Sequence, residues 1–282
     1  MSDAAERTPP AARPSGGGRA PLQWLALPLV LLLGCPNPPP PPDLGPMLAP
    51  AEALRRVTER RDAVRSFRGK VSIDLAVSGE SLSTDAALVV ERPSSLRLDT
   101  LSLLGPTLML AIDDTELTAY SAGDKQFFRG TVHDGAAPAR VLPPMPTSVL
   151  IDALLASPLD PGTEGIEAKP AEDTPGTFDV AIPASGASGA RRLAIDARTG
   201  APRTLEETGL DGQLRYRASW EGAERPVPRS ITIEVPSHDF RVRISVESPD
   251  VNPALPSGLF HLKAPPGATV VDLDSPSAPI LQ

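Results

Sequence analysis

Apolar and polar residues alternate with a period of two along most of the chain from residue 71 onward. Successive side chains of a β-strand point to opposite faces, so this period predicts strands with one apolar face and one polar face. The first such segment places Val71, Ile73, Leu75 and Val77 on one face. The expected strands cover residues 71–77, 82–90, 96–98, 108–112, 117–119, 128, 178–182, 193–195, 214–220, 231–235 and 240–246. We therefore expect a mainly β protein with helices, in which a single antiparallel sheet of about 10–11 strands curls into a half-open barrel.

Two segments instead carry the 3.6-residue period of a helix. Residues 51–67 place Leu54, Val57, Val64 and Phe67 on one stripe, with charged residues opposite, and Pro50 suits a helix start. A second helix is expected over residues 147–156. Residues 157–176 are rich in Pro, Gly and acidic residues and are expected to form a loop.

The N-terminal region contains the one cysteine of the chain, Cys35. Residues 24–34 form an apolar run that is too short to span a bilayer, which needs about 20 residues, and three arginines precede it. The residues Leu32-Leu33-Gly34-Cys35 resemble the bacterial lipobox, in which the peptide is cut before a cysteine that becomes acylated. The alternative is a plain signal peptide followed by an incidental free thiol.

These patterns predict four parts of the chain. They are a lipoprotein signal peptide (1–34), a lipidated cysteine with a Pro-rich tether (35–50), a half-barrel domain (51–263) and a C-terminal tail (264–282). The tether is expected to be stiff and polyproline-like, which gives a reach of up to roughly 45 Å at about 3.1 Å per residue.

The apolar face of the sheet either packs solid or lines a cavity. Its residues are Leu, Val, Ile and Ala with few aromatics, which suits a hydrocarbon ligand better than a sugar or a nucleotide. The polar face carries Arg215, Arg217, Arg241 and Arg243, which we expect to pair with nearby acids. The candidate acyl-binding residues are Val71, Ile73, Leu75, Leu88, Val90, Leu96, Leu98, Leu108, Leu110 and Ile112.

Other classes of function find little support in the sequence. The net charge of −8 disfavours nucleic acid, whose phosphates would repel the chain. No GxSxG nucleophile elbow occurs, and Ser237-His238-Asp239 reads as a turn rather than a catalytic triad because neighbouring strand residues face opposite ways. Asp113 and Asp114 read as a solvated turn. No cluster has metal-ligand spacing, and we expect neither catalysis nor a cofactor.

Three stretches resemble the bacterial LolA/LolB lipoprotein-sorting superfamily. They read RPSSLRLDTLSLLGPTLMLAIDD, LPPMPTSVLIDALLASPLDPG and LPSGLFHLKAPPGATVVDL, and the resemblance covers roughly residues 50–272. It implies a half-barrel capped by helices, whose hydrophobic cavity takes the acyl chains of other lipoproteins. An acylated Cys35 makes the chain closest in type to the receptor LolB.

The resemblance also implies partners and a location. Leu103 and Leu104 lie where the receptor has its membrane-insertion loop, although an ordinary buried loop leucine is the alternative. The implied partners are the acyl chains of lipoproteins, a periplasmic LolA-like carrier and a membrane held through the lipid anchor. The expected location is the outer membrane, facing the periplasm, with the protein as a monomer. The competing hypothesis is a structural or sensory envelope lipoprotein that binds another lipid or a protein partner.

Overall fold

The computed structural model describes residues 46–102, 105–133, 145–159, 165–184 and 189–275. The chain divides into two units, Met1–Asp43 and Leu44–Gln282, and all described residues belong to the second unit. The cysteine, the apolar run and loop residues 103–104 lie outside the described residues.

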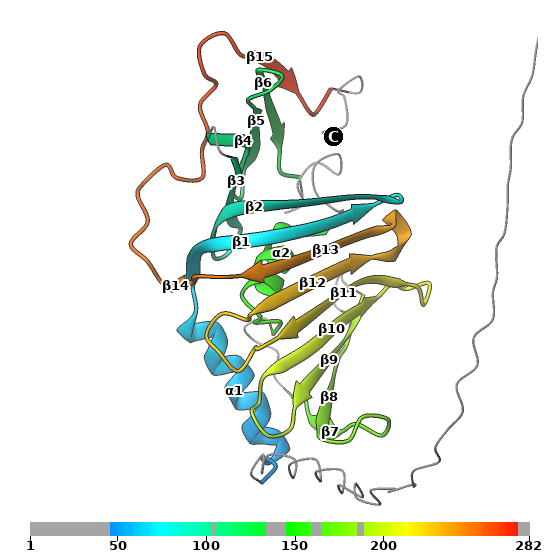
Figure 1. Cartoon of the computed structure of the whole chain (residues 1–282). Helices are drawn as coiled ribbons and strands as arrows, with labels where there is room; N and C mark the ends of the chain where they lie inside the picture. Colours follow the sequence, from blue (N-terminus) through cyan, green and yellow to red (C-terminus); the bar gives the residue numbers. More distant parts are fainter. Residues whose placement is uncertain (1–45, 103–104, 134–144, 160–164, 185–188, 276–282) are drawn as a thin grey trace, which may run out of the picture. The chain divides into compact units, whose positions relative to one another are not determined.

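The described strands form one open, strongly curved sheet (Figure 1). Its order is β15-β6-β5-β4-β3-β2-β1-β13-β12-β11-β10-β9-β8-β7, and β14 pairs with β1. Every pair is antiparallel except β15 with β6, which is parallel. The strands are β1 (Ser66–Val77), β2 (Glu80–Glu91), β3 (Ser95–Ser102), β4 (Gly105–Ile112), β5 (Glu116–Ser121), β6 (Gln126–Thr131), β7 (Ala168–Pro170), β8 (Thr177–Ile182), β9 (Ala190–Asp196), β10 (Pro202–Thr208), β11 (Leu214–Glu221), β12 (Ser230–Val235), β13 (Phe240–Val246), β14 (Asp250–Val251) and β15 (Thr269–Asp272).

The single half-open sheet that the alternation predicts is confirmed, but it holds more strands than expected. Four of the fifteen described strands, β7, β10, β14 and β15, were not predicted. In β10 a register shift near Pro202 and the buried polar Glu207 interrupt the alternation. The other three have four residues or fewer, too few for a period to be visible. β7 lies within the segment expected to be a loop, and β15 lies within the expected C-terminal tail.

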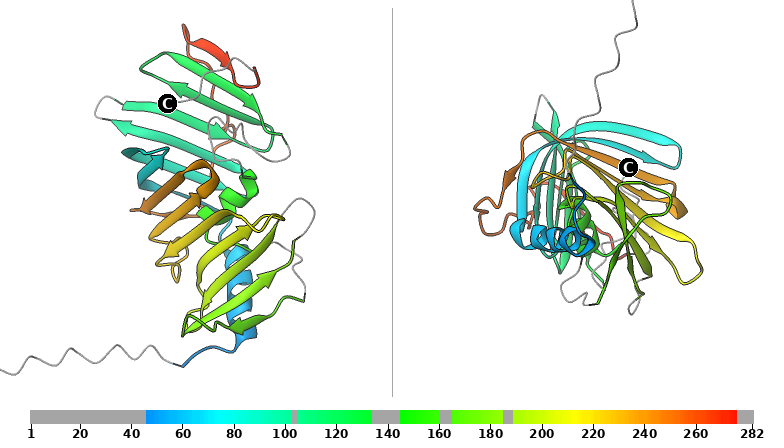
Figure 2. Two further views of the ribbon diagram at one scale, coloured as in Figure 1. Left: turned by 90° about the vertical axis from the view of Figure 1, so that its right-hand side faces the viewer. Right: turned by 90° about the horizontal axis from the view of Figure 1, so that it is seen from below.

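Two helices, α1 (Pro50–Ala63) and α2 (Thr147–Leu154), lie on the concave side of the sheet (Figure 2). Both are shorter than expected. α1 ends at Ala63 because Val64 is extended, and Phe67 is buried as part of β1 rather than as part of a helix. In α2 the five consecutive residues 150–154 are all buried, so the helix is enclosed on nearly every side and not along one stripe only.

The junction between α1 and β1 is held by Asn252, which follows β14. Its side-chain oxygen accepts hydrogen bonds from the backbone N–H groups of Arg65 (2.9 Å) and Ser66 (3.2 Å). Its side-chain nitrogen donates one of 2.8 Å to the carbonyl of Ala63. Asn252 therefore satisfies the Ala63 carbonyl, a group that the C-terminal end of a helix otherwise leaves unpaired, together with two N–H groups at the start of β1.

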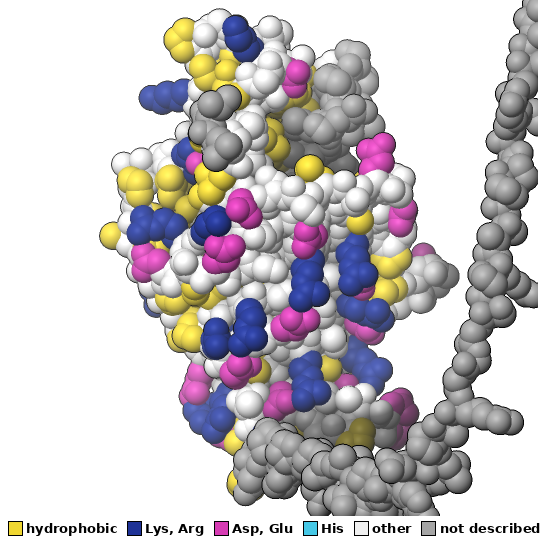
Figure 3. All heavy atoms as spheres, viewed as in Figure 1, with side chains coloured by type: hydrophobic (Ala, Val, Ile, Leu, Met, Phe, Trp, Pro, Cys, Tyr) yellow, Lys and Arg dark blue, Asp and Glu magenta, His cyan; other side chains and the backbone are white. Residues whose placement is uncertain are grey.

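The convex side of the central strands is covered by charges in alternating signs (Figure 3). Arg217 on β11 lies 2.7 Å from Glu206 on β10 and 3.8 Å from Glu234 on β12, and Arg241 on β13 lies 3.5 Å from Glu234. The expected pairing of arginines with acids is confirmed, since Arg243 pairs with Glu221 on this side and Arg215 reaches the buried Glu207 at the ends of β10 and β11. The convex face of these central strands is accordingly solvated.

On the convex side of β3 to β5, the C-terminal segment covers the sheet and excludes solvent. The Arg97 guanidinium donates to the carbonyl of Leu259 (3.1 Å), and the N–H of Leu262 donates to the Thr118 hydroxyl (3.3 Å). Ala111 and Thr118, which alternation would leave exposed, are buried beneath it.

Candidate functional site

The two ends of the strands differ in what lies against them. Along one end, α1 is fastened to the turns: Arg60 donates hydrogen bonds to the carbonyls of Ala223 (2.7 Å) and Pro226 (2.8 Å), and Arg56 donates one to the carbonyl of Thr199 (3.3 Å). The other end is formed by the turns at residues 78–79, 209–213 and 236–239, on the right of Figure 1. We call this second end the open end.

Five apolar residues form a continuous strip on the concave face at the open end. Leu75 on β1 lies opposite Leu82 on β2 and opposite Val242 on β13, and Val77 lies opposite Phe240. Leu82 is 59% exposed, and the other four side chains are half-buried. We call these five residues the apolar strip.

Further along the same strands this face becomes a closed core. Val71 is buried, and Ile73 is 8% exposed. Seven of the ten predicted acyl-binding residues belong to this core, namely Val71, Ile73, Leu88, Val90, Leu96, Leu110 and Ile112. Leu75, Leu98 and Leu108 are the three that remain half-buried. The predicted residues thus share one face, but only a few of them lie near its accessible part.

Sequence reasoning placed Val77, Leu82, Phe240 and Val242 in strands but did not select them as site residues. What brings them together is the pairing of β1 with β13, which are more than 150 residues apart in the chain. Alternation within single strands gives no sign of which distant strand lies beside them. The predicted Leu103, Leu104 and Cys35 lie outside the described residues.

A buried polar pair lies on the same face at the ends of β10 and β11. The Tyr216 hydroxyl donates a hydrogen bond of 3.1 Å to the Glu207 carboxylate, and both residues are at most 6% exposed. The backbone N–H of Gly189 also donates to this carboxylate, at 3.4 Å. At the open end, the concave face therefore changes from apolar to polar between β12 and β10, although Leu205 and Ala218 further along β10 and β11 belong to the core.

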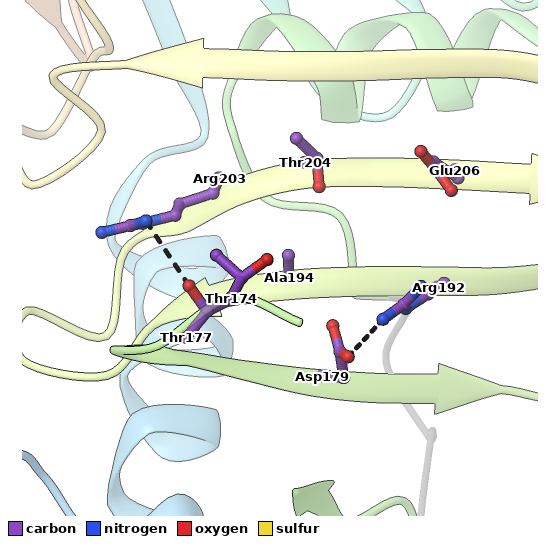
Figure 4. A pocket seen from close by; sticks show the side chains of 8 residues that line it. All are labelled: Thr174, Thr177, Asp179, Arg192, Ala194, Arg203, Thr204 and Glu206. Carbon is purple, nitrogen blue, oxygen red and sulfur yellow. Dashed lines mark hydrogen bonds and ion pairs between the residues drawn. The ribbon is translucent and has the colours of Figure 1, made fainter. Parts of the chain in front are cut away.

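A polar groove lies over the convex side of β8, β9 and β10 (Figure 4). Its volume is about 330 Å³. The Arg203 guanidinium reaches across it to the Thr177 hydroxyl (3.4 Å), and Arg192 forms an ion pair with Asp179. The groove presents hydroxyl and charged groups, so it does not suit a hydrocarbon.

The catalytic candidates in the sequence, the run Ser237-His238-Asp239 and the pair Asp113 and Asp114, lie in turns between strands. Ser237 and His238 form the short 3₁₀ helix between β12 and β13, with the serine oxygen 2.9 Å from His238 Nδ1. Asp239 follows in a left-handed conformation. The turn expected here is confirmed.

Asp113 closes the β4–β5 turn. Burial opposes the ionisation of Asp113, but hydrogen bonds from the N–H groups of Glu116 and Thr115, the Thr115 hydroxyl and the nearby His261 outweigh it and lower the pKa. In the described part of the chain, no three His, Cys, Asp or Glu side chains come together in a way that could hold a metal ion.

Neither described helix combines the length and the hydropathy that crossing a bilayer requires.

The open curved sheet with helices on its concave side agrees with the half-barrel capped by helices that the resemblance to the LolA/LolB superfamily implies. No family model matches the sequence, and no curated protein matches it. Among solved structures, the chain is similar to a LolA superfamily protein from Nitrosomonas europaea, with 13% identity over 73% of this chain and 96% of the other, at a TM-score of 0.44. It is also similar to an outer membrane lipoprotein-sorting protein domain from Vibrio parahaemolyticus, with 11% identity over 74% of this chain and 95% of the other, at a TM-score of 0.49.

Proposed function

We propose that this protein is a lipid-anchored envelope lipoprotein that binds acyl chains at the open end of its concave face and passes other lipoproteins to the outer membrane. The apolar strip is the observation that carries the proposal. Four of its five side chains are half-buried, and Leu82 is 59% exposed in a position continuous with the hydrophobic core. Covering such side chains gains about 25 cal/mol per Å² of apolar surface removed from water.

The strip suits hydrocarbon because it offers methyl and methylene groups and one aromatic ring. An acyl chain needs no hydrogen-bond partner, and each methylene that it buries contributes about 0.8 kcal/mol. A ligand rich in hydroxyl or amide groups would lose hydrogen bonds with water on this surface. Binding and release would then require no covalent step and no cofactor.

The proposed attachment to the membrane rests on Cys35. Acylation there with two or more chains would hold the protein firmly, and the Pro-rich residues that follow would keep the domain clear of the lipid head groups. A handover from a periplasmic LolA-like carrier would run downhill if this face binds acyl chains more tightly than the carrier does and less tightly than the bilayer does. The proposed partners are therefore that carrier, the acyl chains and the membrane.

A structural or sensory role is the second candidate, and one observation favours it. Seven of the ten predicted acyl-binding residues are packed into the core beside α2, which leaves the accessible apolar surface near the open end. A protein partner with one apolar side chain could cover the strip as well as a lipid could.

The deciding experiment is mass spectrometry of the unacylated chain, residues 36–282, secreted into the periplasm and purified without detergent. We expect co-purifying acyl species in the native chain and their loss in a Leu75→Asp, Leu82→Asp double variant. Depletion of the protein in its own cells should then leave other lipoproteins in the periplasm. Correct sorting after depletion would refute the receptor role, and absence of acyl species in the native chain would refute lipid binding itself.

A further inference from the structure

A second depression, of about 590 Å³, lies where β7, β8 and β9 reach the open end. Its walls come from the residues before β7, from the end of β8 and from the start of β9. It adjoins the convex polar groove, and the two share Asp179 and Arg192 (Figure 4). It is therefore separate from the apolar strip, which lies on the concave face of β1, β2 and β13.

The depression is richer in cationic than in acidic groups. Lys169, Arg191 and Arg192 line it, against the carboxylates Glu167 and Asp179. Arg192 is already paired with Asp179, and Arg191 also has an interaction partner. Lys169, in contrast, is exposed and makes no ion pair or hydrogen bond with any residue that the structure describes. A chain of net charge −8 thus has a local excess of positive charge here, with an ammonium group available to a ligand.

The rest of the lining is mostly apolar, with Thr208 as its one further polar side chain. Ile166, Ala181, Pro183 and Ala190 contribute hydrocarbon surface beside the charged groups. The volume lies within the range of about 300–1,000 Å³ that is usual for small-molecule sites. A cavity with apolar walls and cationic groups is complementary to a molecule that joins a hydrocarbon body to an anion.

We infer that this depression binds the acidic head group of an amphiphile, a phosphate or carboxylate carried on a hydrocarbon body. Lys169 meets the anion, because ammonium groups form charge-assisted hydrogen bonds to phosphate and carboxylate oxygens. The apolar walls meet the part of the hydrocarbon next to the head group. This site goes beyond the proposed function and does not depend on acyl binding by the apolar strip.

The test uses the full chain in envelope membranes and two photoactivatable lipids with the same diazirine acyl chain, phosphatidylglycerol and phosphatidylcholine. Labelled peptides are identified by mass spectrometry. We expect phosphatidylglycerol to label residues 165–192 at least five-fold more than phosphatidylcholine does. Lys169→Glu should abolish that preference, whereas Lys263→Glu, at an exposed lysine in the C-terminal segment, should preserve it.

Inorganic phosphate at millimolar concentration separates the two sources of the anion. If it suppresses the labelling by phosphatidylglycerol, the site accepts a free phosphate group; if it does not, the lipid body is required. Equal labelling by the two lipids, or an unchanged preference in folded Lys169→Glu protein, would overturn the inference. Labelling of β1, β2 and β13 is read in the same samples, so a failure of this site is distinguishable from a failure of the proposed function.

Discussion

Arg61 on α1 donates a hydrogen bond of 2.7 Å to the carboxylate of Asp152 on α2. The other oxygen of the same carboxylate accepts one from Arg92, which directly follows β2. All three side chains are at most 19% exposed, and burial raises the pKa of Asp152 although both arginines oppose that rise. One carboxylate thus joins the two helices to the sheet.

Replacement of Asp152 by Ala should destabilise the protein strongly. It would leave two largely buried guanidinium groups without their anion, and the loss of one partner from a buried ion pair costs about 3–5 kcal/mol. The free energy of unfolding in urea measures the effect. Asp250→Ala is the matched control, because its ion pair with Arg68 is exposed and is worth about 1 kcal/mol or less. Equal losses in the two variants would show that the Asp152 cluster contributes no more than a surface pair.

Asp196 should make stability depend on acidic pH. Burial opposes its ionisation, but hydrogen bonds from the N–H groups of Thr199 and Arg198, the Arg203 guanidinium and the Thr199 hydroxyl lower its pKa from 3.8 to about 2. Between these two values the unfolded chain binds more protons at this group than the folded chain does. The stability that Asp196 contributes is therefore present above pH 3.8 and is lost as the pH falls to about 2.

The measurement for Asp196 compares the native chain with Asp196→Asn in urea at several pH values. We expect the difference in free energy of unfolding to be largest near neutral pH and to shrink as the pH falls through this window. A difference that stays constant with pH would assign the effect to hydrogen bonding alone.

Asn252 offers a test of the junction between α1 and β1. It makes three hydrogen bonds there and has a φ of 50°, a left-handed conformation that Asn and Gly adopt more readily than Ala. Asn252→Gly should lose the hydrogen bonds alone, at a cost of about 1–3 kcal/mol. Asn252→Ala should lose them and add backbone strain, so it should have the lower midpoint of thermal unfolding. The reverse order would exclude strain at this position.

The same junction shows how far the sequence could predict this fold. Alternation in β1, β2 and β13 predicted the strands and their apolar face, because this signal is local to each strand. The end of α1 was misplaced because Val64 is extended there, at a junction held by Asn252, which lies 189 residues from Ala63 in the chain and donates a hydrogen bond to its carbonyl. The expected helical stripe also included Phe67, whose burial in a strand looks the same in sequence.

The candidate site was harder to predict than the fold. Leu75 was selected, but its neighbours Leu82 and Val242 were not, since the pairing of strands decides which residues meet. Alternation assigns Leu88 and Leu75 to the same face of the sheet and does not distinguish them. Leu88 is nevertheless 2% exposed, whereas Leu75 is half-buried. Alternation separates the two faces of a sheet, but it does not show where helices cover one of them.

The apolar strip makes a specific prediction for lipid binding. Leu82→Asp should weaken binding of a fluorescent fatty acid by the unacylated chain at least tenfold, because a carboxylate against hydrocarbon would lose hydration and repel the acid group of the probe. Folding should be preserved, since Leu82 is already 59% exposed. Leu210→Asp is the control: Leu210 is 88% exposed in the β10–β11 turn and lies outside the strip. Fluorescence titration of both variants measures the affinities, and equal losses would mean that the probe binds through general surface hydrophobicity.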